Sequence, residues 1–197
     1  MAEPMPESVD QTVQACIATG EYCGALDLLA RTYLETVYRY CFRMLNGDAG
    51  RARDVTQQVF EEVCRGIAAY RGEASAKTWL LGIARNQCLK EIDVRARHRS
   101  MLRDNLEHVA TQVHTAPALG SEAALLSHEW LTRLQWALDQ LESEERSLLV
   151  MRFGIGVGRE LSATEIAQIL GLSRASAYRK LQEALTRLRR VMYDDAG

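Results

Sequence analysis

The stretch that most constrains the fold is residues 161–190, where two helical patterns are joined by a tight turn. Ser162 and Glu165 form a Ser-x-x-Glu capping box, which predicts the start of the first helix. Gly171 can adopt the positive φ that ends a helix, and Ser173 is suited to cap the next one. That second helix keeps apolar residues on one side and basic residues on the other. Together these features predict a helix-turn-helix.

The basic side of the second helix suggests DNA as the ligand. Side chains near the start of such a helix reach base edges in the major groove, and basic ones bind phosphates. The alternative is an ordinary helical hairpin whose basic face is solvated, but the capping box, glycine turn and basic helix together favour DNA. The candidate DNA-reading residues are Ser173, Arg174, Ser176, Arg179 and Lys180.

Charge is unevenly distributed along the 197 residues, although the net charge is only −2. A nucleic-acid function therefore rests on two local basic patches, the second helix above and residues 85–103. The acidic N-terminus has no apolar core, and no apolar run approaches the roughly 20 residues needed to cross a bilayer. We expect a cytoplasmic protein with no membrane insertion.

The five cysteines are widely spaced and form no C-x-x-C motif, so disulfides are not expected. Cys41, Cys64 and Cys88 lie within apolar helical patterns and are expected to be core thiols. Cys16 and Cys23 leave a redox role open. The histidines lack ligand spacing, which argues against a metal site. No nucleophile–base constellation or phosphate-binding glycine loop appears, so we expect no catalytic residue, no cofactor and no enzymatic activity.

The first half of the chain predicts three helices with apolar faces at helical spacing. Residues 1–20 are expected to be a flexible segment with a short helix from Thr12 to Thr19. A long helix is expected to end near Asn46, a second to open at Asp48, and a third to begin around Ala76. In the second helix, Val55, Val59, Phe60, Val63 and Ile67 form the apolar stripe, and the opposite polar face is open to plain solvation.

The weak pattern after residue 103 predicts a linker over residues 104–122. A second domain over residues 123–193 should contain a helix capped by Ser143 and ended at Gly154, a glycine-containing loop, and the helix-turn-helix. With the first domain over residues 21–103, the predicted fold class is all-α, with two small helical domains joined by a flexible linker.

Three stretches resemble bacterial RNA polymerase sigma factors of the extracytoplasmic-function type, within the sigma-70 family. Residues 52–60 look like the family's polymerase-binding helix, usually D-x-x-Q-E-x-F. Residues 70–86 are similar to its R-G-E-x-x-x-x-T-W-L-x-x-I-A-x-N signature, and residues 141–190 to its upstream-promoter-reading domain. Gln58 departs from the usual glutamate, which removes one charge. The loop at residues 154–158 is longer than in most compact members.

The resemblance implies a function in transcription initiation, with core RNA polymerase (β′ and β subunits), promoter DNA and an anti-sigma factor as partners. It implies polymerase-binding roles for Asp54, Gln57, Gln58, Phe60, Glu61 and Glu62. It implies roles at the −10 promoter element for Lys77, Trp79, Arg85, Asn86, Lys90, Arg95 and Arg97. The helix-turn-helix residues above would read the −35 element.

Two alternatives stay open at this point. Tryptophans on helices are usually core residues, so Trp79 could pack inside the domain instead of meeting a flipped base. A free-standing helix-turn-helix regulator would account for the C-terminal domain, but it would leave residues 54–86 without a role and would normally dimerise on a palindrome.

Overall fold

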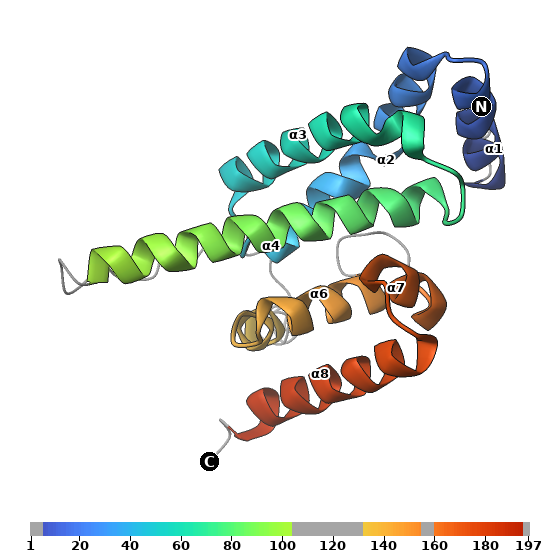
Figure 1. The fold of residues 1–197 in the computed structure, drawn as a ribbon. Helices are drawn as coiled ribbons and strands as arrows, with labels where there is room; N and C mark the ends of the chain where they lie inside the picture. The colour runs from blue at the N-terminus through green and yellow to red at the C-terminus, as the bar shows by residue number, and fades with distance from the viewer. Residues whose placement is uncertain (1–5, 104–131, 155–159, 195–197) are drawn as a thin grey trace, which may run out of the picture.

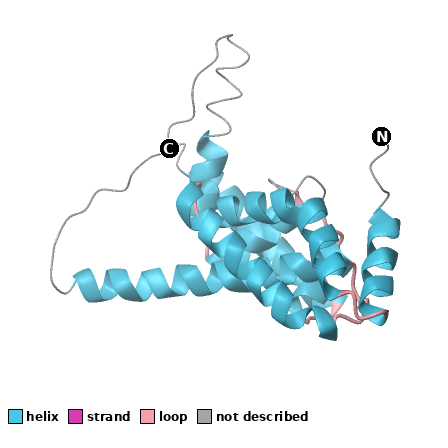
Figure 2. Ribbon diagram, turned by 90° about the horizontal axis from the view of Figure 1, so that it is seen from above, coloured by secondary structure: helices cyan, strands magenta, loops and turns pink. Residues whose placement is uncertain are grey.

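The computed structural model describes residues 6–103, 132–154 and 160–194, and these residues contain helices but no strand (Figures 1 and 2). Residues 132–139 are helical and lead into the second domain. The other elements are α1 (Pro6–Ala18), α2 (Tyr22–Met44), α3 (Ala49–Gly66), η1 (Ile67–Ala69), α4 (Ala76–Arg103), α6 (Ser143–Arg152), α7 (Ala163–Leu170) and α8 (Arg174–Asp194). The predicted all-α class is confirmed. The predicted linker lies outside the described residues.

The first domain is built on α2, α3 and α4, which pack against one another around a shared apolar core. The α2 helix ends at Met44, after which Asn46 and Gly47 both have positive φ. Asp48 then caps α3 by accepting a hydrogen bond from the Arg51 amide at 3.1 Å. The predicted turn and helix start are therefore both confirmed.

Residues 6–18 depart from the flexible segment predicted for residues 1–20. They form α1, which packs against α2 and the start of α4. Val9 and Val13, four residues apart on one face, are fully buried in the shared core. The short helix expected from Thr12 is present, but the prediction of flexibility is wrong for residues 6–11, where the helix begins. Val9 and Val13, with the partly buried Cys16 and Ile17, dock it once α2 and α4 supply the partner surface.

The second domain contains residues 132–139, α6, α7 and α8. Ser162 and Glu165 form the predicted capping box, and Gly171 takes the left-handed conformation with φ of 62°. Ser173 accepts a hydrogen bond from the Ser176 amide at 3.2 Å, so it caps α8 as predicted. The cap of α6 is a correction: Glu142 occupies the N-cap position instead of Ser143, and it exchanges hydrogen bonds with Glu145.

The two domains pack against each other, with α6 against α2 and α4 and α7 against α4 (Figure 1). Buried side chains of both belong to one hydrophobic cluster. At its centre the hydroxyls of Tyr40 and Ser147 are hydrogen-bonded at 2.9 Å, with Tyr40 fully buried. Burial raises the pKa of Tyr40, so its hydroxyl stays protonated within this contact.

The burial of the cysteines differs from the prediction at one position. Cys41 and Cys88 are buried core thiols as expected, but Cys64 is exposed on α3, where that prediction is wrong. The described residues contain neither a cluster of metal-ligating side chains nor a helix long and apolar enough to span a membrane.

Candidate nucleic-acid and polymerase interfaces

The outer face of α3 carries the predicted polymerase-binding side chains. Those exposed to solvent are Asp54, Gln57, Gln58, Glu61 and Glu62, and Phe60 is half-buried beside them. The Gln57 amide donates to the Glu61 carboxylate at 3.0 Å, and Arg65 pairs with Glu62 at 3.0 Å. Figure 1 shows α3 on the side of the molecule away from α6, α7 and α8. The structure thus leaves this acidic and amide-rich face accessible.

A pocket of about 540 Å³ lies between the loop at residues 70–75 and the first half of α4. Its first-domain lining is Ala69, Tyr70, Arg71, Gly72, Glu73, Ala74, Thr78, Trp79, Gly82, Ile83 and Asn86. A stacked aromatic platform and an amide on one wall suit an unpaired base, because the ring can stack and the amide can hydrogen-bond a base edge.

The aromatic wall of this pocket is Trp79 together with Tyr70. Their ring centroids are 4.8 Å apart, and the Tyr70 hydroxyl donates to the Ala74 carbonyl at 2.7 Å. Burial, aided by the nearby Asp10 carboxylate, raises the pKa of Tyr70 to about 12, so the phenol stays a donor. Trp79 is half-buried, and it lies against Gly66 as well as lining the pocket. Trp79 thus packs within the domain and also faces the pocket, which leaves its expected contact with a flipped base a prediction.

Asn86 is exposed at the same pocket, two turns after Trp79, and its carboxamide oxygen accepts a long hydrogen bond from Arg85 at 3.4 Å. Arg85 differs from the exposed basic residues of the predicted −10 set, because its side chain is only 12% exposed. Its Nε is buried and has no hydrogen-bond partner among the described residues. This guanidinium is poorly satisfied where it lies, and a phosphate would be a stronger partner.

The remaining predicted −10 residues are spread along α4. Lys77 is half-buried in its first turns. Lys90, Arg95 and Arg97 are exposed on the second half of the helix, beyond the pocket. Arg95 pairs with Asp48 at 3.9 Å, and Arg97 donates to the Asp93 carbonyl. The structure thus separates a base pocket from a basic stripe that could follow a phosphate backbone.

The start of α8 holds the predicted −35 residues. The Ser173 and Ser176 hydroxyls are hydrogen-bonded to each other at 3.0 Å, so both contribute to the helix cap. Arg174 is exposed, and Arg179 is exposed beside Glu183, 4.0 Å away. Lys180 is less free, because it pairs with Glu144 at 3.6 Å.

Glu144 is a residue that sequence reasoning missed as a functional one. Its carboxylate pairs with Lys180 of α8 and, also at 3.6 Å, with Arg85 of α4. One carboxylate thus forms an ion pair with a cation of each predicted DNA-binding surface, in the way that a DNA phosphate would. The sequence indicates only that Glu144 lies in a first helical turn, which explains its charge without any distant partner.

Two side chains of the second domain also line the pocket. Gln168 and Ile169 of α7 line it, and a Cβ placed on Gly82 would lie 3.9 Å from Ile169. In this arrangement, α7 of the second domain therefore lies against the candidate base-binding pocket of the first domain. Nothing in the local sequence around residues 168–169 signals this contact.

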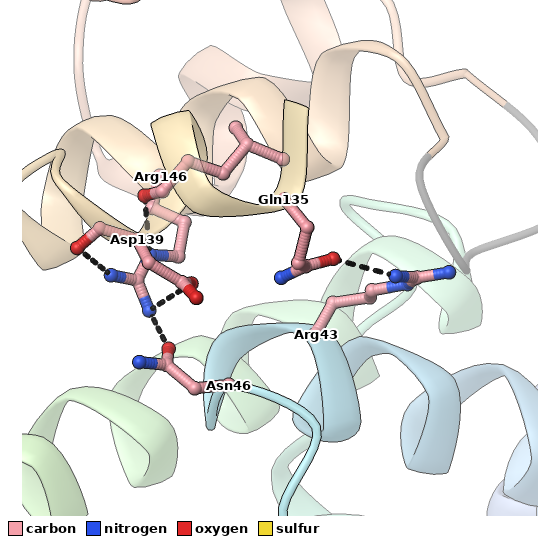
Figure 3. A network of polar contacts seen from close by, with 6 residues as sticks. Arg43, Asn46, Gln135, Asp139 and Arg146 are labelled. Carbon is pink, nitrogen blue, oxygen red and sulfur yellow. Dashed lines mark hydrogen bonds and ion pairs between the residues drawn. The ribbon is translucent and has the colours of Figure 1, made fainter. Parts of the chain in front are cut away.

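A polar network joins the domains at the end of α2 (Figure 3). Arg43 donates to Gln135 at 2.8 Å, and Arg146 donates to Asn46 across the interface. Arg146 also donates to the Leu138 and Asp139 carbonyls, each at 3.0 Å. Burial lowers the pKa of Arg146 and raises that of Asp139, while the charge of each partner opposes these shifts.

Two family models match the chain. The model described as Sigma-70 region 2 matches residues 29–98, and the model described as Sigma-70, region 4 matches residues 137–190. The first range holds the α3 face and the pocket, and the second holds the helix-turn-helix. Both lie within the predicted domains.

Curated relatives agree with these models. The chain is 28% identical over 165 residues to the ECF RNA polymerase sigma factor SigX of Bacillus subtilis, covering 84% of this chain and 82% of the relative. It is 28% identical over 170 residues to the ECF sigma factor SigE of Mycolicibacterium smegmatis, covering 84% and 63%.

Two solved structures share the fold. One is the sigma factor RpoE in complex with the anti-sigma factor NepR from Bartonella quintana, with a TM-score of 0.59 and 18% identity over 83% of this chain and 93% of that one. The other is CnrH in complex with the cytosolic domain of CnrY, with a TM-score of 0.61 and 19% identity over 95% and 99%.

Proposed function

Because the chain belongs to the sigma-70 family, in its extracytoplasmic-function type, it is an alternative sigma factor that directs RNA polymerase to promoters, and we propose how its residues divide that work. The outer face of α3 binds core RNA polymerase, through Asp54, Gln57, Gln58, Phe60, Glu61 and Glu62. Its carboxylates steer the encounter toward a basic surface on the polymerase.

The base pocket of α4 takes up an unpaired base of the −10 element. The observation that carries this assignment is the position of Trp79 and Asn86 on one pocket of about 540 Å³. Extruding a base costs a few kcal/mol, and stacking with amide hydrogen bonds offsets that cost. Lys77, Arg85, Lys90, Arg95 and Arg97 bind the backbone of the same strand.

The start of α8 reads the −35 element in the major groove, through Ser173, Arg174, Ser176, Arg179 and Lys180. An arginine that bonds a guanine bidentately contributes about 1–3 kcal/mol of discrimination. The chain supplies no chemistry of its own, works in the cytoplasm, and leaves nucleotide addition to the polymerase.

The packed arrangement of the two domains is a resting state that must open before promoter DNA binds. Glu144 occupies cations of both DNA-binding surfaces, and α7 lies against the base pocket. An anti-sigma factor is the expected regulatory partner, since the solved relative RpoE is held in a complex with one.

Run-off transcription with purified core polymerase and a pool of genomic promoter fragments tests the function. Adding this protein should produce discrete new transcripts whose upstream sequences align in two elements. Asn86→Ala should keep polymerase binding but reduce promoter opening about tenfold, as expected for losing roughly 1–3 kcal/mol of base contact. No new transcript and no co-elution with polymerase would favour the free-standing regulator instead.

A further inference from the structure

Helix α1 precedes the residues that match the region 2 model, yet it contacts the loop that forms the base pocket. The Asp10 carboxylate accepts a hydrogen bond from the Ala76 amide at 2.7 Å. Ala76 is the first residue of α4, the helix that carries Trp79 and Asn86. A side chain from outside the matched domain thus holds the start of the base-reading helix.

The hydrogen bond between Asp10 and Ala76 stabilises the N-terminus of α4. The first amides of a helix have no partner within it, and a carboxylate there is favoured by the helix dipole. In α4 the Ser75 hydroxyl accepts from the Thr78 amide at 3.1 Å, and Asp10 accepts from Ala76. The N-terminus of α4 is therefore capped jointly by the pocket loop and by α1.

A second contact lies one turn further along α1. Gly72, in the middle of the pocket loop, has φ of 71°, and a Cβ at that position would overlap the side-chain amide of Gln14. The positive φ of Gly72 favours glycine, and a larger side chain there would push the exposed end of Gln14 aside. Asp10 and Gln14, on one face of α1, thus contact the first residue of α4 and the middle of the loop.

The loop held by α1 also contacts the aromatic wall of the pocket. Tyr70 bonds the Ala74 carbonyl across the loop, and its ring lies against Trp79. Because Asp10 fixes residue 76 and Gln14 lies against residue 72, the segment between them has little freedom to change shape.

We infer that α1 sets the shape of the base pocket, and that Asp10 is a positioning residue for promoter opening, acting through the loop at residues 70–75 and the Tyr70–Trp79 pair. This inference rests on the proposed function of the pocket. It assigns α1 a role in base recognition that acts through its contacts with α4 and the loop.

The test compares Asp10→Ala with Asp10→Asn in holoenzyme assembled from the full chain and core polymerase. Opening is followed by 2-aminopurine fluorescence at a −10 base, and polymerase affinity is measured separately. Removing an N-terminal cap should lower the opening equilibrium roughly 2- to 30-fold. Asp10→Asn should retain most of the wild-type opening equilibrium, because its amide oxygen can accept the same hydrogen bond. Gln11→Ala, an exposed change on the same helix, is the matched control.

A spectroscopic readout separates positioning from general stability. In a background of Trp130→Phe and Trp136→Phe, the remaining Trp79 reports the aromatic wall. Asp10→Ala and Gln14→Ala should each shift its emission while polymerase affinity stays unchanged, and Gln11→Ala should not. Opening at the wild-type level in Asp10→Ala would overturn the inference. So would a parallel loss of polymerase affinity, which indicates a folding defect.

Asn86→Ala distinguishes this failure from failure of the proposed function. If it abolishes opening while Asp10→Ala does not, the pocket assignment stands and the inference fails. If Asp10→Ala impairs opening and Asn86→Ala does not, the route through the pocket is overturned.

Discussion

The first domain has two outward faces predicted to be functional, on α3 and on α4, and the structure treats them differently. The α3 face is exposed, and its Glu61 and Glu62 carboxylates pair with Arg65 of the same helix. The α4 face lies against the second domain, which lines its pocket and pairs with Arg85. Under the proposed assignment, polymerase docks on the α3 face as it stands, whereas promoter DNA fills the pocket only after α7 moves away from it.

The contacts that hold the second domain against the first differ in burial and geometry. The Tyr40–Ser147 contact is buried and well formed, and Arg146 makes hydrogen bonds on both sides of the interface. Arg85 and Glu144, in contrast, meet at 3.6 Å with the Glu144 side chain 59% exposed. This contact at a predicted DNA-binding cation is therefore weaker than the buried contacts, which suits a surface proposed to change partners.

Arg146→Met should have the largest effect, because it leaves two carbonyls, Asn46 and the partly buried Asp139 carboxylate without their partner. Losing one member of a buried ionic network costs about 3–5 kcal/mol. We expect urea unfolding of the full chain to show this loss at pH 7. Arg133→Met, an exposed arginine of the same domain, should show almost none.

The deficit should also depend on pH with a defined sign. Burial already raises the pKa of Asp139, and removing Arg146 raises it further. A raised native pKa adds stability below the unfolded value and loses it as pH rises. The Arg146→Met deficit should therefore shrink toward pH 4. A deficit independent of pH would show that Asp139 does not matter, and Asn46→Gly would then isolate the contribution of the interface alone.

Reversing charge on the open face should have an intermediate effect. The double change Glu61→Lys and Glu62→Lys should weaken polymerase binding about tenfold, mainly through slower association. Binding kinetics at two salt concentrations would show this. Glu35→Lys is the matched control, because Glu35 forms a similar exposed pair with Arg39 on α2. Altered domain packing in the double variant would show that the two faces are not independent.

Glu144→Gln should give the smallest change, and it should be a gain. Exposed pairs contribute about 0.2–1 kcal/mol, so binding of a short promoter duplex by the free protein should rise up to about fivefold. Fluorescence anisotropy can measure this rise. Glu160→Gln removes an exposed carboxylate that pairs with no cation of the described residues and controls for net charge. An equal gain in both variants would remove any specific role for Glu144.

Much of the candidate site could be predicted because it lies within single helices. Trp79 and Asn86 are seven residues apart, so helical periodicity alone places them on one side of α4. The polar face of α3 follows in the same way from the apolar stripe opposite to it. The low exposure of Arg85 could not be predicted, because periodicity describes one helix and says nothing about a second domain that packs against it.

By itself, the sequence determined the local structure of this protein: its helices, most of their caps, the positive φ of Gly171 and the faces that carry polar or basic side chains. These follow from contacts between residues three or four positions apart, whose geometry the chain dictates directly. Only the tertiary structure decided that α1 caps α4, that Glu144 pairs with one cation of each predicted DNA-binding surface and that α7 lies against the pocket. Such contacts join residues distant in sequence, and their energies depend on burial and distances that exist only after the helices have packed.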